Sequence, residues 1–140
     1  MVEFVEVEAG GLRFKLVKGL LYTESDEWIR VEDGVLVVGI TDYAQKKLKD
    51  IVGVELPEPG RRVSKGETVA VVESIKATGE VYAPVDGEVV EVNERLLDEP
   101  ELVNTDPYGE GWIYKLRAEG EPEGLLDWQA YLESVKRREG

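Results

Sequence analysis

The chain has 140 residues, no cysteine and no histidine, and a net charge of −13. The length suits a single domain over residues 1–140 with its own hydrophobic core. The missing residue types exclude disulfides, thiolate or imidazole metal sites, cysteine nucleophiles and histidine bases. The acidic balance argues against nucleic acid and anionic membranes as partners. No apolar run approaches the roughly 20 residues of a membrane span, so we expect a cytoplasmic protein.

The first predicted element is a hairpin. Residues 2–7 and 12–16 alternate between apolar and polar side chains, and Ala9-Gly10-Gly11 lies between them as a turn. Acidic side chains on the first arm and basic side chains on the second could pair across the strands. We treat residues 1–19 as an added N-terminal hairpin that extends the edge of a sheet.

A second hairpin and a short helix follow. Asp33-Gly34 suits a turn with positive φ between the strand-like runs 28–32 and 35–40. Thr41 is placed to cap a helix that continues to about Lys49, with lysines in its last turn. Residues 51–56 form the next predicted strand, which Pro57 ends.

The most regular stretch is centred on Lys76. Residues 68–72, 80–82 and 88–92 are rich in β-branched side chains and read as strands. Residues 74–79 interrupt the apolar pattern and predict a hairpin turn. Lys76 would then be fully solvated at the tip of this turn, projecting from a rigid base.

The C-terminal part predicts one helical turn at 93–98, a loop at 101–111 and a strand at 112–117. The last element, within residues 122–138, is a helix from Leu125 to about Arg138. Its apolar stripe is predicted to pack on the domain's own sheet and consists of Leu125, Trp128, Leu132 and Val135. The fold class is therefore mostly β, a sandwich or barrel with three short helices.

Several motifs now suggest a family. Residues 73–77, followed by 82–84 and 87–89, resemble the attachment hairpin of lipoyl carrier domains. From about Leu20 to the C-terminal helix, further motifs resemble the H protein family of the glycine cleavage system: residues 27–28, 39–45, 54–57, 92–94 and 106–112. The resemblance implies a barrel-sandwich hybrid, a flattened sandwich of two antiparallel sheets. Residues 20–118 would be its lipoyl-type core, with short peripheral helices and a C-terminal helix.

The same resemblance implies a function. Lys76 would carry lipoic acid as an amide, attached by a lipoate ligase or lipoyl transferase. The arm would accept an aminomethyl group from the glycine decarboxylase, which uses pyridoxal phosphate. It would present the group to the tetrahydrofolate-dependent aminomethyltransferase and be reoxidised by the flavoenzyme dihydrolipoyl dehydrogenase. The chain itself would be a non-catalytic carrier and a monomer.

The family pattern also implies roles for neighbouring residues. Glu73 and Ala77 would serve recognition by the modifying ligase. Ser25, Glu27 and Glu80 match positions of a cleft that shelters the loaded arm, although plain surface charge is an alternative for the glutamates. Many relatives have His where Asp26 stands, and some have His where Lys47 stands. Any role of imidazole in the cleft therefore does not transfer to this sequence.

Three alternatives remain open at this point. A biotinyl carrier has a similar fold, but such carriers usually place Met on both sides of the lysine, where this chain has Ile75 and Ala77. A lipoate store or relay for other complexes would keep the fold and the modification. An interaction domain would leave Lys76 unmodified. Lipoyl domains of 2-oxo-acid dehydrogenases are a less favoured alternative, because they usually belong to longer chains with mobile linkers.

Overall fold

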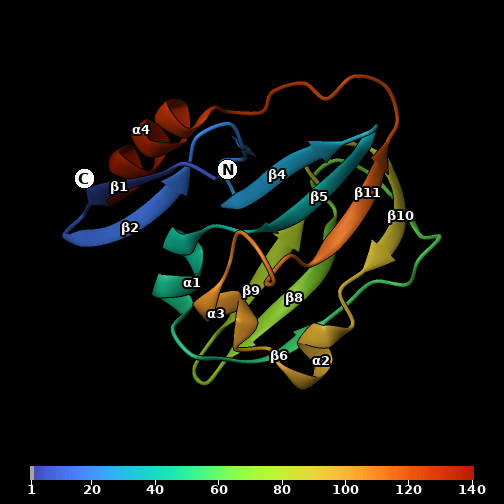
Figure 1. Cartoon of the computed structure of the whole chain (residues 1–140), viewed down its shortest axis with the longest axis horizontal. Helices are drawn as coiled ribbons and strands as arrows, with labels where there is room; N and C mark the ends of the chain where they lie inside the picture. Colours follow the sequence, from blue (N-terminus) through green and yellow to red (C-terminus); the bar gives the residue numbers. More distant parts are fainter. Residues whose placement is uncertain (1) are drawn as a thin grey trace.

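The computed structural model describes residues 2–140, so that Met1 of the predicted N-terminal hairpin lies outside the described residues. The strands form three antiparallel sheets with the orders β1-β2, β3-β4-β5-β11-β10-β7 and β6-β8-β9 (Figure 1). Their bounds are β1 Phe4–Ala9, β2 Leu12–Val17, β3 Leu21–Tyr22, β4 Glu27–Glu32, β5 Val35–Ile40, β6 Ile51–Glu55, β7 Arg62–Val63, β8 Thr68–Ser74, β9 Thr78–Tyr82, β10 Gly87–Val92 and β11 Tyr114–Ala118. The helices are α1 Asp42–Leu48, α2 Arg95–Asp98, α3 Leu102–Thr105 and α4 Trp128–Glu139. The predicted fold class, mostly β with short helices and a C-terminal helix, is confirmed.

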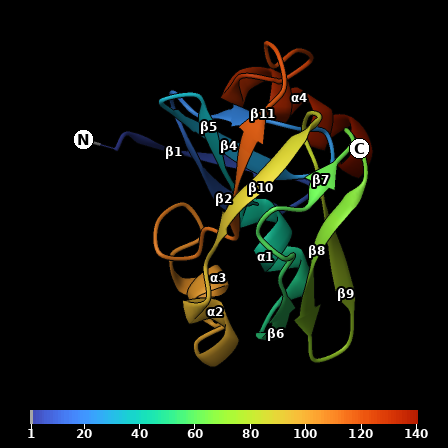
Figure 2. The ribbon, with the colours of Figure 1, turned by 90° about the vertical axis from the view of Figure 1, so that its right-hand side faces the viewer.

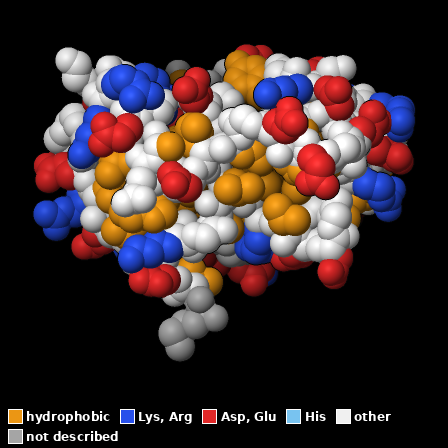
Figure 3. Space-filling model, turned by 90° about the horizontal axis from the view of Figure 1, so that it is seen from above, with side chains coloured by type: hydrophobic (Ala, Val, Ile, Leu, Met, Phe, Trp, Pro, Cys, Tyr) orange, Lys and Arg blue, Asp and Glu red, His pale blue; other side chains and the backbone are white. Residues whose placement is uncertain are grey.

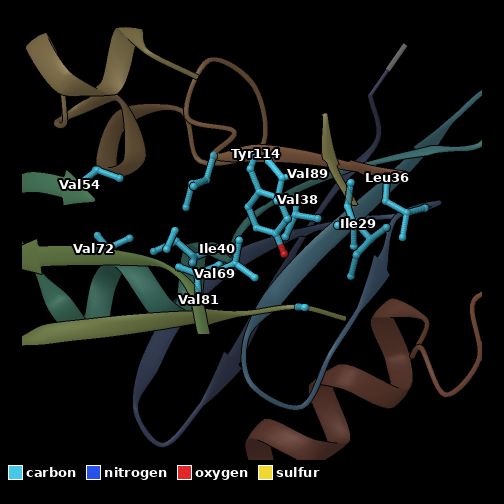
Figure 4. Close-up of a cluster of buried hydrophobic side chains, with 14 of the residues drawn as sticks. Ile29, Leu36, Val38, Ile40, Val54, Val69, Val72, Val81, Val89 and Tyr114 are labelled. Carbon is cyan, nitrogen blue, oxygen red and sulfur yellow. The ribbon is translucent and has the colours of Figure 1, made fainter. Parts of the chain in front are cut away.

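The main hydrophobic core lies between the six-stranded and the three-stranded sheet. Alternate side chains of each strand point inward, so Val38 and Tyr114 of the large sheet face Val72 and Val81 of the small one (Figure 4). All four side chains are fully buried. The two strands that flank Lys76, β8 and β9, therefore have a rigid base.

A second core joins the N-terminal hairpin to the C-terminal helix. It contains Phe14 and Leu16 of β2, Trp28 of β4, and Tyr131 and Val135 of α4. β1 and β2 lie beside α4 at one end of the molecule (Figure 1). The hairpin is thus a separate two-stranded sheet, and the prediction that it extends the edge of another sheet is wrong, because its apolar face packs on α1 and α4.

The predicted turn and cap chemistry is confirmed. Asp33 and Gly34 have φ values of 50° and 79°, as the tight turn between β4 and β5 requires. Thr41 caps α1, its hydroxyl accepting a hydrogen bond from the backbone of Ala44 at 3.2 Å. These features fix the direction in which the chain leaves β5 and enters α1.

Several predicted bounds were wrong. The last helix begins at Trp128 rather than Leu125, because Asp127 caps it and the backbone of Leu126 pairs with that of Tyr22. The predicted loop at 101–111 contains α3, and the strand expected from Trp112 begins at Tyr114. The two-residue strands β3 and β7 are too short to give a periodic signal in the sequence.

Charged side chains of both signs are spread over the surface. Seen from above, acidic and basic groups surround apolar patches in the middle of that face (Figure 3). Among residues 2–140, no helix is long and apolar enough to cross a membrane. The hairpin of β8 and β9 ends on the far side of the molecule from this face (Figure 2).

Candidate functional site

Lys76 lies in the turn between β8 and β9 with its side chain exposed. Ser74 holds the turn: its hydroxyl accepts from the backbone N–H of Ala77 at 3.1 Å and donates to the carbonyl of the same residue at 3.0 Å. The backbone N–H of Ser74 donates to that carbonyl as well, at 2.8 Å. The predicted turn and the predicted exposure of Lys76 are confirmed, and the turn is tight although its tip is solvated.

The neighbours of Lys76 form an accessible surface around the amine. Ile75 is 70% exposed, an unusual fraction for a large apolar side chain. Ala77 is exposed, and the half-buried Glu73 lies opposite Gly53 of β6. Glu73 and Ala77 thus stand close to Lys76 at the end of the small sheet, and neither side chain is buried.

A pocket of about 250 Å³ opens beside the base of this hairpin. Its walls come from β8 and β9, from α1, from the segment before β4 and from the end of α4. The lining residues are Ser25, Asp26, Ile40, Tyr43, Ala44, Lys47, Leu48, Val72, Gly79, Glu80 and Arg138. The structure thus brings together Ser25 and Glu80, two of the three residues predicted to form a cleft, although they are 55 positions apart in the sequence.

Glu27, the third predicted cleft residue, is completely buried. Its carboxylate accepts hydrogen bonds from the hydroxyls of Thr23 and Ser25 and from the backbone N–H of Tyr82, the last at 3.2 Å. Burial raises the pKa of Glu27 to about 7, and the hydrogen bonds from Ser25 and Thr23 oppose this shift. The alternative that Glu27 is a plain surface charge is therefore wrong.

Glu27 also borders a second, more open pocket of about 640 Å³. This pocket lies between the segment before β4, the end of β9 and residues 124–126, and Ser25 lines both pockets. Glu27 thus links Ser25, which lines the first pocket, to Tyr82 of β9. Its immediate effect is to fix the position of Ser25.

Asp26 makes the most extensive contacts of the residues around the first pocket. Its carboxylate accepts two hydrogen bonds from the guanidinium of Arg138, at 2.8 and 3.2 Å, and one from the hydroxyl of Tyr131 at 2.8 Å. Asp26 raises the pKa of Arg138, which therefore stays charged. The Arg138 guanidinium lies 5.6 Å from the ring centroid of Tyr43, so α4 and α1 meet at the pocket.

Sequence reasoning missed Arg138, Tyr43 and Tyr131 as residues around the pocket. Arg138 is 112 positions from Asp26, so no local pattern in the sequence connects the two residues. Lys47, noted for the absence of His, forms an ion pair with Glu139 at 3.1 Å. The only local signal was the polar run from Thr23 to Glu27 before an apolar strand.

The arrangement combines an exposed primary amine, an apolar pocket near it and charged groups at the pocket rim. The residues of β8 and β9 that line the pocket are about three positions from the turn. At the rise of a β-strand this separation is roughly 10 Å. A long flexible group attached to Lys76 could fold back that far. The chain has no cysteine, so thiol–disulfide chemistry would have to come from such a group.

Comparison with known proteins agrees with this geometry. The family model described as "Glycine cleavage H-protein" matches residues 20–138. The "Probable glycine cleavage system H protein" of Aeropyrum pernix is 66% identical over 138 residues, which cover 97% of this chain and 96% of the relative. The "Glycine cleavage system H protein" of Thermotoga maritima is 58% identical over 114 residues, covering 80% and 92%.

A solved structure is similar as well. The crystal structure of a glycine cleavage system H protein from Mycobacterium marinum superimposes with a TM-score of 0.77 at 40% sequence identity, covering 84% of this chain and 97% of that one. The family model begins at residue 20, so the N-terminal hairpin lies outside the part it matches. The resemblance inferred from the motifs is confirmed, and the chain belongs to the glycine cleavage H-protein family.

Proposed function

We propose that this chain is the lipoyl-carrying shuttle of a glycine cleavage system, with lipoic acid attached to Lys76. Membership of the H-protein family supports the carrier role in glycine cleavage. The observation that carries the choice of residue is the exposed Lys76 on a hairpin tip within the motif of residues 73–77. Glu73 and Ala77 flank the amine and would be recognised by the lipoate ligase or lipoyl transferase.

The attached group would supply a disulfide that is reduced as it accepts a one-carbon amine and is later reoxidised. The partners would be glycine decarboxylase, the tetrahydrofolate-dependent aminomethyltransferase and dihydrolipoyl dehydrogenase. Because the arm must enter three active sites, the protein has to present it at a projecting tip, as the turn between β8 and β9 does. We place the carrier in the cytoplasm, as a non-catalytic monomer.

The residues of this chain would contribute position and shelter. The first pocket offers apolar walls at Ile40, Leu48 and Val72, which suit a hydrocarbon arm and a sulfur ring. Ser25 and Glu80 stand at its rim, where polar groups of the arm would lie. The carboxylate of Glu27 accepts a hydrogen bond from the hydroxyl of Ser25 and so fixes the position of that residue. A pocket that excludes water would slow hydrolysis of a labile amine on the arm.

Intact-mass analysis tests the attachment site. The chain should gain one lipoyl increment when it is incubated with lipoate, ATP and a lipoate ligase, and the Lys76→Arg variant should gain none. Lys65→Arg, at an exposed lysine away from the turn, is the matched control and should be lipoylated normally. A biotin increment with biotin ligase would identify a biotinyl carrier, and a lipoyl increment that persists in Lys76→Arg would refute the assignment.

A second assay tests the reaction. The lipoylated protein should support glycine–bicarbonate exchange by glycine decarboxylase, and Lys76→Arg should reduce the exchange to background. Efficient transfer of lipoyl groups to other proteins without any exchange would identify a lipoate relay instead.

A further inference from the structure

The N-terminal hairpin of β1 and β2 lies outside the part of the chain that the family model matches, which begins at residue 20. Its two-residue turn is Gly10-Gly11, so that Ala9 and Leu12 form the first hydrogen-bonded pair and every second pair beyond them follows the same pattern. Residues 4, 6 and 8 of β1 and residues 13, 15 and 17 of β2 therefore direct their backbone N–H and C=O groups away from the other strand. These groups form the two outer edges of the hairpin.

The outer edge of β2 is hydrogen-bonded to side chains of neighbouring elements. The carboxylate of Asp42 accepts from the backbone N–H of Lys15 at 2.8 Å, and the hydroxyl of Tyr108 donates to the carbonyl of the same residue at 2.7 Å. The hydroxyl of Tyr22 accepts from the N–H of Val17 at 2.8 Å and donates to its carbonyl at 3.0 Å. This edge is therefore not available to another strand.

The outer edge of β1 is open. Within residues 2–140, β1 pairs with β2 alone, and no other group hydrogen-bonds to the outward backbone of Phe4, Glu6 or Glu8. These three side chains are exposed, and the two that alternate with them, Val5 and Val7, are half-buried against the second core. An open strand edge is a template for pairing with another chain.

We propose that the outer edge of β1 binds an extended segment of a partner protein by strand addition, and that this segment alternates basic with apolar side chains. The backbone of the added strand would hydrogen-bond to Phe4, Glu6 and Glu8. Its basic side chains would lie opposite the two glutamates. Its apolar side chains would lie on the other face, beside Val5 and Val7, and would remove more of their surface from water.

The acidic side chains determine which strand fits the edge. Charged residues at an edge prevent unwanted pairing, and here they disfavour a second copy of this chain. Antiparallel registers that set Glu6 opposite its own counterpart or opposite Glu8 bring like charges together, and each chain has a net charge of −13. A basic strand meets no such repulsion, so the glutamates exclude copies of the chain and admit a partner of opposite charge.

The edge of β1 is separate from the turn that carries Lys76. β1 and β2 lie beside α4 in the upper part of Figure 1, whereas the turn between β8 and β9 lies at the bottom of Figures 1 and 2. A partner bound to β1 would leave Lys76 accessible. The inference therefore goes beyond the proposed function and does not depend on it.

A synthetic peptide that alternates lysine with valine tests the inference on the full-length protein. In NMR spectra, this peptide should slow the hydrogen exchange of the amides of Phe4, Glu6 and Glu8, whereas those of Val5 and Val7 are already protected by β2. Methylation of the lysine backbone nitrogens of the peptide should abolish binding, because these nitrogens would face β1. Methylation of its valine nitrogens keeps the same charge and should leave binding intact, and a peptide that alternates glutamate with valine should not bind.

Variants of β1 test the same edge from the side of the protein. The N–H of Glu6 faces outward, so Glu6→Pro keeps the pairing with β2 and should weaken binding of the lysine–valine peptide by about tenfold. Glu6→Gln keeps the backbone and should weaken binding by about threefold. Glu55→Gln, at an exposed position in a different sheet, is the control for loss of one charge and should bind normally. Thermal unfolding verifies that each variant is folded.

Three results would overturn the inference. The first is the absence of binding, and the second is binding that neither Glu6→Pro nor methylation of the lysine nitrogens weakens, which would show adsorption by charge alone. The third is a dimer in sedimentation that Glu6→Pro dissociates, which would identify a second copy as the occupant. Lipoylation of Lys76 should be the same in Glu6→Pro and the wild type, so each of these results leaves the proposed function intact.

Discussion

The turn that carries Lys76 lies beyond the first pocket and the segment from Thr23 to Glu27 contributes to its wall, and the two regions are held in different ways. The turn is closed by hydrogen bonds between Ser74 and Ala77, three residues apart. The segment is bonded to distant parts of the chain, through Glu27 to Tyr82 and through Asp26 to Arg138. The first arrangement is local and the second depends on the whole fold.

The difference matches the demands on each region. Under the proposed function, the turn enters the active sites of other proteins and must keep its shape while its surroundings change, so its bonds have to be internal. A pocket wall must keep its shape relative to other elements, so its bonds have to cross between them. Variants that loosen one region without the other can test this comparison.

The largest expected effect is at Glu27. Burial raises its pKa to about 7 from a normal value of 4.5, so the folded protein keeps a proton that the unfolded chain releases between these pH values. The stability that this proton provides is present below pH 4.5 and is lost as the pH rises through 7. Glu27→Gln should therefore gain about 3 kcal/mol in free energy of unfolding relative to the wild type between about pH 4 and about pH 8.

Urea denaturation at a series of pH values measures this difference. Glu55→Gln, at an exposed position on β6, controls for the loss of one surface charge. Lipoylation of Lys76 should be unaffected by Glu27→Gln, since the turn has its own bonds. If the free energies of unfolding of Glu27→Gln and the wild type changed with pH in parallel, the pKa of Glu27 would not be raised in the folded protein.

A smaller effect is expected at Gly10, where the N-terminal hairpin meets the end of α4. Gly10 has φ 58°, and a Cβ there would lie 2.8 Å from the Cβ of Glu139. Gly11 also has positive φ, at 78°, but a Cβ there would meet nothing within 4 Å. Gly10→Ala should cost about 2 kcal/mol and Gly11→Ala about 1 kcal/mol.

Thermal or urea unfolding of the two variants separates backbone strain from the contact with Glu139. Equal losses of stability in the two variants would show that a Cβ at residue 10 does not clash with Glu139 at the end of α4. A larger loss in Gly10→Ala would show that the hairpin supports the element that carries Arg138, and hence the pocket wall rather than the turn.

The change in stability expected at Ser74 is as small as that in Gly11→Ala. Ser74→Ala removes the two hydroxyl hydrogen bonds of the turn and should cost about 1 kcal/mol. The rate of lipoylation should nevertheless fall, because the amine is presented less rigidly. Thr78→Ala, at an exposed position where β9 begins, is the control, and an unchanged rate in Ser74→Ala would show that the ligase does not require the closed turn.

Much of the fold could be predicted because its signals are local. The turn at Asp33-Gly34, the cap at Thr41 and the strands around Lys76 each follow from a few adjacent residues. The start of α4 could not be predicted in the same way, because Leu125 fits the apolar stripe of the helix. A backbone pairing between Leu126 and Tyr22 keeps that part of the chain extended.

The site was predictable to the same extent. The exposed turn that carries Lys76 could be predicted because the turn and the motif are continuous in the sequence. The burial of Glu27 was not found, because a glutamate before Trp28 looks like the polar end of a strand. Its partners Thr23 and Ser25 are close in sequence, but Tyr82 is 55 positions away. The pairing of Asp26 with Arg138 depends on how α4 packs, which no local pattern specifies.

The internal hydrogen bonds of the Lys76 turn have a practical consequence. A segment that closes on itself carries its conformation with it, so residues 73–78 could be transplanted between two antiparallel strands of an unrelated protein with the same register. The recipient would gain a compact handle for enzymatic labelling at one defined amine. The pocket could not be transplanted in this way, because its walls come from four separate parts of the chain.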